Sequence, residues 1–233
     1  MKEIIEQLRS AGKESYKKTL MRHGVPEPVF GASIAEMKKI QKRVRRHHAL
    51  ALQLYDSGIY DARYLAGLIA EDDKMTVKDL TRWVEGANCH TLSECTVAWV
   101  AAEGPHGMEM ALVWIESKKE SIASSGWATL GYLAALQDDA ALGRPLFKRL
   151  LGRVRETIHQ QPNRVRYVMN GFVIGAGCYV KELAALSLDT ARAIGPVTVD
   201  MGDTACAVPD AAAYILKVKE RGTLGKKRKT VKC

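Results

Sequence analysis

The chain has 233 residues, of which 47% are hydrophobic and 26% are charged, and its formal net charge is +9. This composition is typical of globular domains and excludes a wholly disordered or low-complexity chain. No run of 18 uncharged apolar residues occurs, and the first 15 residues have no apolar core, so neither a membrane-spanning helix nor a secretory signal is expected.

Apolar residues spaced three and four apart predict helices along almost the whole chain. The expected helices cover residues 2–10, 13–22, 33–44, 47–55 and 59–71, then a helix opening at 76–79, then 91–103, 106–117, 120–136, 142–160, 163–177, 179–194 and 209–220. Ser33 and Glu36 have the spacing of a capping box, and Pro209 suits the first turn of the last helix.

So many short helices with short connections predict an all-α solenoid or bundle. No crisp repeat is visible, so a solenoid would be built from degenerate repeats. Nothing marks a linker. We therefore expect one continuous domain over residues 1–220, followed by a basic C-terminal tail over residues 221–233.

Residues 196–208 interrupt the helical pattern. Their alternating β-branched residues flank Met201-Gly202, which predicts a small β-hairpin with its turn at that pair. The tip would consist of Val199, Asp200, Met201, Gly202 and Asp203. An isolated hairpin is marginally stable in water, so it must pack on the helices or bind a partner.

The positive charge is concentrated in three segments. Residues 38–46 hold six cations and no anion, residues 144–166 hold seven cations against one anion, and residues 217–233 hold eight cations against one. Each segment alone could be a solvated helix face or a mobile tail. Three such segments together favour a polyanionic partner, and nucleic acid above all.

Common catalytic and metal-binding motifs are missing. The sequence contains no phosphate-binding loop, no GxGxxG, no HExxH, no CxxC and no nucleophile elbow, so we expect no cofactor and no metal. Five cysteines without a CxxC pair indicate reduced thiols and a cytoplasmic protein. Hydrolytic chemistry would have to come from a carboxylate in a basic or aromatic cleft, with Trp83–Trp99 as the main candidate region.

Several motifs occur in an order and spacing that resemble the DNA alkylation repair family, the HEAT-like-repeat DNA glycosylases. They are Phe30-Gly31-Ala32-Ser33, the run from His48 to Arg63, and Met75-Thr76 followed by Leu80 and Trp83-Val84. The resemblance covers most of the chain and is strongest over residues 30–136. It implies a C-shaped stack of helical repeats that holds duplex DNA on a basic concave face.

The same resemblance assigns four positions to the family's active-site cleft. Glu94 falls at the catalytic carboxylate, which is an aspartate in active members, His90 and Phe172 fall at tryptophans, and Ser124 falls at an arginine. A longer carboxylate, a missing arginine clamp and weaker cation–π capture are hard to reconcile with base excision. Alternatively, Glu94 belongs to a capping box in which Thr91 is the N-cap.

The sequence leaves three functions open. The first is a DNA-binding protein that recognises branched or distorted DNA by shape without base excision, because the hairpin and the basic tail resemble a non-excising branch of the family. Its phosphate contacts would come from Lys38, Lys42, Arg45, Lys148, Arg149, Arg164, Arg166, Lys226, Lys227, Arg228 and Lys229.

The second function is a monofunctional glycosylase that excises N3- or N7-alkylated purines with Glu94 as the carboxylate. The third is a protein-interaction scaffold, against which the basic bias argues. We expect a monomer with DNA as its partner and no contact with membranes.

Overall fold

Thirteen α-helices and four short 3₁₀ or π turns make up the regular structure in the computed structural model, which describes the whole chain from Met1 to Cys233. The α-helices are α1 (Lys2–Ala11), α2 (Glu14–Arg22), α3 (Ile34–Val44), α4 (His48–Asp56), α5 (Tyr60–Ile69), α6 (Val77–Gly86), α7 (Ala98–Glu103), α8 (Gly107–Trp114), α9 (Glu120–Leu136), α10 (Arg144–Thr157), α11 (Asn163–Tyr179), α12 (Ala184–Ile194) and α13 (Ala211–Glu220).

These helices confirm the all-α prediction, and their ends show which local signals the chain uses. Thr76 forms a complete capping box with Asp79 at the start of α6. At α3 only half of the predicted box forms, because Ser33 accepts from the Glu36 amide while the Glu36 carboxylate pairs with Lys39 instead. The α13 helix begins at Ala211, after Pro209 and an Asp210 cap.

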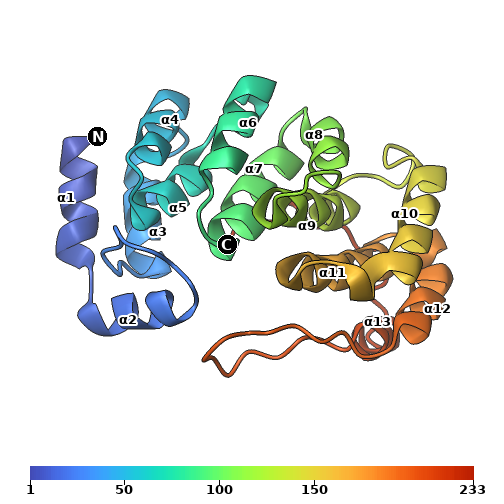
Figure 1. Cartoon of the computed structure of the whole chain (residues 1–233). Coiled ribbons are helices and arrows are strands. Elements are labelled where there is room, and N and C mark those ends of the chain that lie inside the picture. Colours follow the sequence, from blue (N-terminus) through green and yellow to red (C-terminus); the bar gives the residue numbers. More distant parts are fainter.

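Neighbouring helices pack in pairs that follow one another along an arc (Figure 1), with α4 against α5, α8 against α9 and α11 against α12. The α4, α6 and α8 helices form the outer edge, and α5, α7 and α9 lie inside it. Two hydrophobic clusters fill the arc, one mainly from the first half of the chain and one mainly from the second. The apolar stripes predicted from sequence therefore bury themselves between successive helices.

No single helix is long and apolar enough to span a membrane, and only α11 taken together with Lys181–Ile194, bent by 117°, passes that test.

The predicted β-hairpin at residues 196–208 is absent. The segment leaves α12 and returns to α13 as two lengths of chain without strands (Figure 1), and no backbone ladder joins its two arms. Instead, the Asn163 side-chain nitrogen donates to the Asp200 carbonyl, and the Asp200 amide donates to the Asn163 side-chain oxygen, both at 2.7 Å. Gly202 has a φ of +64°, so the chain does turn where predicted. We call residues 196–208 the crossing loop.

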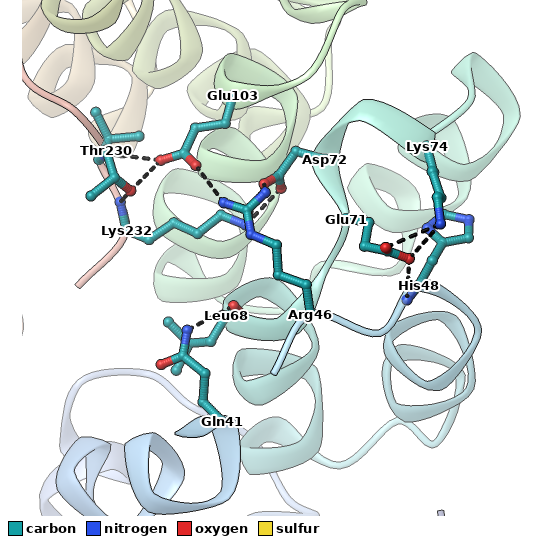
Figure 2. A network of polar contacts seen from close by, with 11 residues as sticks. Gln41, Arg46, His48, Leu68, Glu71, Asp72, Lys74, Glu103, Thr230 and Lys232 are labelled. Carbon is teal, nitrogen blue, oxygen red and sulfur yellow. Dashed lines mark hydrogen bonds and ion pairs between the residues drawn. The ribbon is translucent and has the colours of Figure 1, made fainter. Parts of the chain in front are cut away.

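Residues 221–233 form a docked segment that returns to the middle of the arc, and we call it the C-terminal strap. The Arg228 amide donates to the Ala135 carbonyl at 2.8 Å, and Val231 is buried in the first hydrophobic cluster. The Lys232 ammonium binds both carboxylate oxygens of Asp72 at 2.6 and 2.8 Å (Figure 2). A mobile tail, one of the alternatives that the sequence leaves open, is therefore wrong.

Candidate nucleic-acid interface

A buried ion pair between Glu94 and Arg164 lies at the centre of the candidate site. Glu94 stands in a π-helical stretch, Leu92–Val97, directly before α7, and Arg164 stands in the first turn of α11. The guanidinium donates to both carboxylate oxygens, at 2.8 and 2.5 Å, and its carbon lies 4.4 Å from the centre of the Tyr167 ring. π-Helical turns are frequent at functional sites, and this one sets a carboxylate against the arginine of a helix 70 residues later.

Burial decides the electrostatics of this pair. The Glu94 side chain is 7% exposed, and burial raises the pKa of its carboxyl while the Arg164 charge opposes that rise. The capping alternative for Glu94 is wrong, because Thr91 makes no side-chain cap hydrogen bond. Both oxygens of the carboxylate accept from one guanidinium, so the charge of Glu94 is neutralised by Arg164 in a buried pair. This geometry does not favour the excision alternative.

The structure brings together three of the four positions that the resemblance assigned to the cleft. His90 and Ser124 line one hollow of about 250 Å³ together with Arg164, whose partner is Glu94. The buried Ser124 hydroxyl donates to the Ser121 carbonyl at 3.1 Å. An arginine is thus present beside Ser124, but it comes from α11. Phe172 is fully buried against Trp127 and Phe147, and it lines a second cavity together with Glu94.

His90 gives the site a pH-dependent stability. Burial, followed by the charges of Arg164 and His23, lowers the pKa of His90 from 6.5 to about 4. Because the pKa of His90 is lower in the folded chain than in the unfolded chain, neutral His90 contributes fully to the free energy of unfolding above pH 6.5. This contribution is lost as the pH falls toward 4. Solvent reaches part of the ring and screens its charge, so we expect the free energy of unfolding to fall by only about 1–2 kcal/mol. Urea unfolding at pH 7 and pH 4.5 measures it, and the same loss in His90→Gln would contradict it.

One group of predicted phosphate-binding cations lies at the end of α3. Lys38, Lys42 and Arg45 are exposed and form no ion pair. Arg45 ends the helix at φ 58° and ψ −149°, a backbone conformation that is nearly restricted to glycine. Such strain costs of order 1–3 kcal/mol and is concentrated at functional sites. A guanidinium therefore stands at a position where glycine would be more stable.

The C-terminal strap carries a second group of cations and brings it beside the first basic segment. Lys229 and Arg46 line the same hollow of about 560 Å³, although they are far apart in sequence. Arg46 also reaches Asp72 and Glu103, which hold the strap (Figure 2). Two of the three basic segments are therefore adjacent in the fold.

The remaining predicted cations differ in their exposure and in whether a carboxylate of the chain already binds them. Lys226, Arg228 and Lys229 are exposed and form no ion pair, whereas Lys227 is bound to Asp139 and to the Ala134 carbonyl. Lys148 and Arg149 are exposed on α10, at the outer end of the arc (Figure 1). Arg166 is half-buried and donates to Asn163.

The crossing loop passes over the Glu94–Arg164 pair and reaches the other end of the arc. The Met201 sulfur lies 3.8 Å from a guanidinium nitrogen of Arg164. A Cβ built on Gly202 would lie 3.9 Å from the Arg22 carbonyl oxygen, which belongs to the last residue of α2. The loop therefore extends from the C-terminal helices across the candidate site to the end of α2.

A cavity of about 350 Å³, which we call the tyrosine pocket, lies next to this pair. Glu94 and Phe172, two of the four positions that the resemblance assigned to the cleft, line it, but sequence reasoning missed its tyrosines. Residues of α9, α11, α13 and the strap line it, and four of them are tyrosines: Tyr132, Tyr167, Tyr179 and Tyr214. Glu94 stands at its edge. A usable signal existed, since Gly171 and Gly175 repeat at helical spacing on α11 between Tyr167 and Tyr179.

Comparison with known proteins identifies relatives along most of the chain. A family described as "DNA alkylation repair enzyme" matches residues 4–183. The uncharacterized protein Lmo0209 of Listeria monocytogenes is 33% identical over 210 residues, covering 88% of this chain and 90% of its own length. Lin0241 of Listeria innocua is 32% identical with the same coverage.

A solved structure matches the chain over its whole length. It is described as "A new family of proteins related to the HEAT-like repeat DNA glycosylases with affinity for branched DNA structures". Its sequence is 34% identical, its TM-score is 0.91, and the match covers 100% of this chain and 99% of the other. The helical arc described above is therefore a HEAT-like repeat fold.

Proposed function

The chain belongs to the DNA alkylation repair enzyme family, and from that premise we propose that it binds DNA and recognises branched DNA by shape, without excising bases. The observation that carries this proposal is the match to a solved structure whose own family has affinity for branched DNA, with a TM-score of 0.91 over the full chain.

The Glu94–Arg164 pair supports binding without excision. A carboxylate that stabilises an oxocarbenium ion or positions water must present its negative charge to the substrate. Here one guanidinium takes both oxygens, and Met201 of the crossing loop lies against that guanidinium. An active site in this arrangement would have to break a buried ion pair before it could act.

Exposed cations supply affinity that does not depend on base sequence. Lys38, Lys42 and Arg45 on one segment, with Lys226 and Lys229 on the strap, are not neutralised by carboxylates of the chain. Each phosphate that they contact releases counterions from the DNA, so binding should weaken steeply as salt is added. Shape enters through the placement of these cations, because two basic segments that are far apart in sequence line one hollow.

Binding to a four-way junction and to a linear duplex of the same sequence, measured by fluorescence anisotropy between 50 and 200 mM salt, tests the proposal. We expect tighter binding to the junction and a linear fall of log K with log salt, with a slope of several units. Replacing Lys226, Arg228 and Lys229 by glutamine should reduce that slope by about one unit for each phosphate that these side chains neutralise in the wild type.

Lys78→Gln is the matched control, because Lys78 is also exposed and unpaired but lies on α6, at the outer edge of the arc (Figure 1). We expect it to leave the slope unchanged. Equal affinity for junction and duplex, or a flat salt response of the wild type, would refute the proposed function.

A further inference from the structure

We propose that the tyrosine pocket binds a single unpaired nucleobase from the branch point of DNA. The inference rests on the proposed function and adds to it a site for one nucleotide. It concerns the cavity between α9, α11, α13 and the strap, and it does not use Glu94 as a chemical group.

The walls of the pocket present aromatic rings from three helices. Tyr132 comes from α9, Tyr167 and Tyr179 come from α11, and Tyr214 comes from α13. Tyr132, Tyr167 and Tyr179 are partly exposed, and Tyr214 is 50% exposed. Tyr214 also belongs to neither hydrophobic cluster, so its ring is available to a ligand. Aromatic side chains on which bases stack are the common means by which proteins hold single-stranded nucleotides.

Glycines make the space between the walls. A Cβ on Gly175 would lie 3.0 Å from the Gly131 carbonyl oxygen, so α9 and α11 cross with their backbones close together. One turn earlier on α11, Gly171 is exposed and a Cβ there would meet nothing within 4 Å. The cavity of about 350 Å³ falls within the roughly 300–1,000 Å³ typical of pockets for small organic groups.

The polar groups of the pocket suit a neutral ring attached to an anionic backbone. The hydroxyls of Tyr167, Tyr179 and Tyr214 make no hydrogen bond within the chain, so they are available to the edges of a base. Of the two charged side chains that line the pocket, Glu94 is neutralised by Arg164, while Arg228 forms no ion pair. The net charge at the mouth is therefore positive, which complements a phosphate.

A base can reach such a pocket only where it is not stacked and paired. Extruding a paired base from a duplex costs a few kcal/mol, and the cost is least for a base that is already unpaired. Branch points that contain an unpaired nucleotide supply such bases. The tyrosine pocket would then favour these branches over fully paired DNA, in addition to the shape preference.

The decisive comparison uses two three-way junctions that differ in one position. Both carry a single unpaired nucleotide at the branch, and in one of them a tetrahydrofuran residue replaces the nucleotide, which removes the base and keeps the phosphates. We expect the wild-type chain to bind the junction with the base about tenfold more tightly than the abasic one, measured by anisotropy.

Gly171→Leu is designed to fill the pocket, and Gly152→Leu is its matched control. Gly152 is also a helical glycine whose Cβ would meet nothing within 4 Å, but it lies on α10, outside the pocket. Replacing a helix-interior glycine that has open space around it raises helix propensity, so both variants should fold at least as well as the wild type. We expect the tenfold ratio to fall to about one in Gly171→Leu and to persist in Gly152→Leu.

A second pair of variants keeps the test independent of how leucine fits. Tyr214→Ala should lower the ratio to about threefold or less, and Tyr214→Phe should retain it, because stacking needs the ring and not the hydroxyl. A wild-type ratio near one overturns the pocket proposal, as does a wild-type ratio in both Gly171→Leu and Tyr214→Ala. The junction-over-duplex preference of the wild type, measured in parallel, separates this failure from a failure of the proposed function.

Discussion

Replacing Arg164 by methionine should lower the free energy of unfolding by about 3–5 kcal/mol. The guanidinium is the ion-pair partner of a carboxylate that is 7% exposed, and removing one partner of a buried pair leaves an uncompensated charge. The pKa of Glu94 is already raised by burial and rises further without Arg164. Part of the missing stability should therefore return as the pH is lowered and Glu94 takes up a proton.

The double variant Glu94→Gln with Arg164→Met separates charge from packing. It removes both charges and keeps similar volumes, so it should recover most of the stability. Urea unfolding of the wild type, the single variant and the double variant at pH 7 and pH 5 gives the required comparison. A double variant that is as unstable as Arg164→Met would mean that guanidinium packing on Tyr167, rather than the ion pair, holds the site.

Replacing Lys232 by methionine should lower the free energy of unfolding by about 3 kcal/mol. Lys232 and Asp72 are 7% and 2% exposed, and the ammonium contacts both carboxylate oxygens (Figure 2). Burial lowers the pKa of Lys232 and raises that of Asp72, so each group depends on the other for its charge. Breaking a buried pair costs about 3–5 kcal/mol, and we expect the lower value here. Arg46 stays 3.2 Å from Asp72 and still partly neutralises its charge.

Lys229→Met is the control, since Lys229 is an exposed residue of the same strap without an ion pair. It should change stability by less than about 0.5 kcal/mol. The two variants are compared by urea unfolding, and hydrogen exchange of the Val231 amide, which donates to Glu103, shows whether the strap is released. Equal stability of the two variants would show that the Lys232–Asp72 pair contributes nothing to the fold.

The helices could be predicted because their signals are local. The α9 helix spans residues 120–136, as the apolar spacing predicts, and the Thr76 box forms as its residues require. The crossing loop was predicted wrongly for a physical reason. Val197 and Val199 alternate because both are buried against the second cluster, not because their backbone pairs with another strand.

The candidate site could be predicted only in part, because its central contacts join distant residues. Glu94 and the basic segments are visible in the sequence, but 70 residues separate Glu94 from Arg164 and 160 separate Asp72 from Lys232. No local pattern links such partners. The cation-rich composition of the strap likewise indicates a solvated tail, and only the buried acids on distant helices account for its docking.

The docking of the strap also imposes an order on biosynthesis. The ribosome makes Lys232 160 residues after Asp72, which at bacterial or eukaryotic elongation rates is on the order of 8–32 s later. Until Lys232 is made, Arg46 is the cation from the first half of the chain that pairs with Asp72. The buried Asp72–Lys232 pair can therefore form only after the strap has been synthesised, so this part of the first half of the arc is completed late.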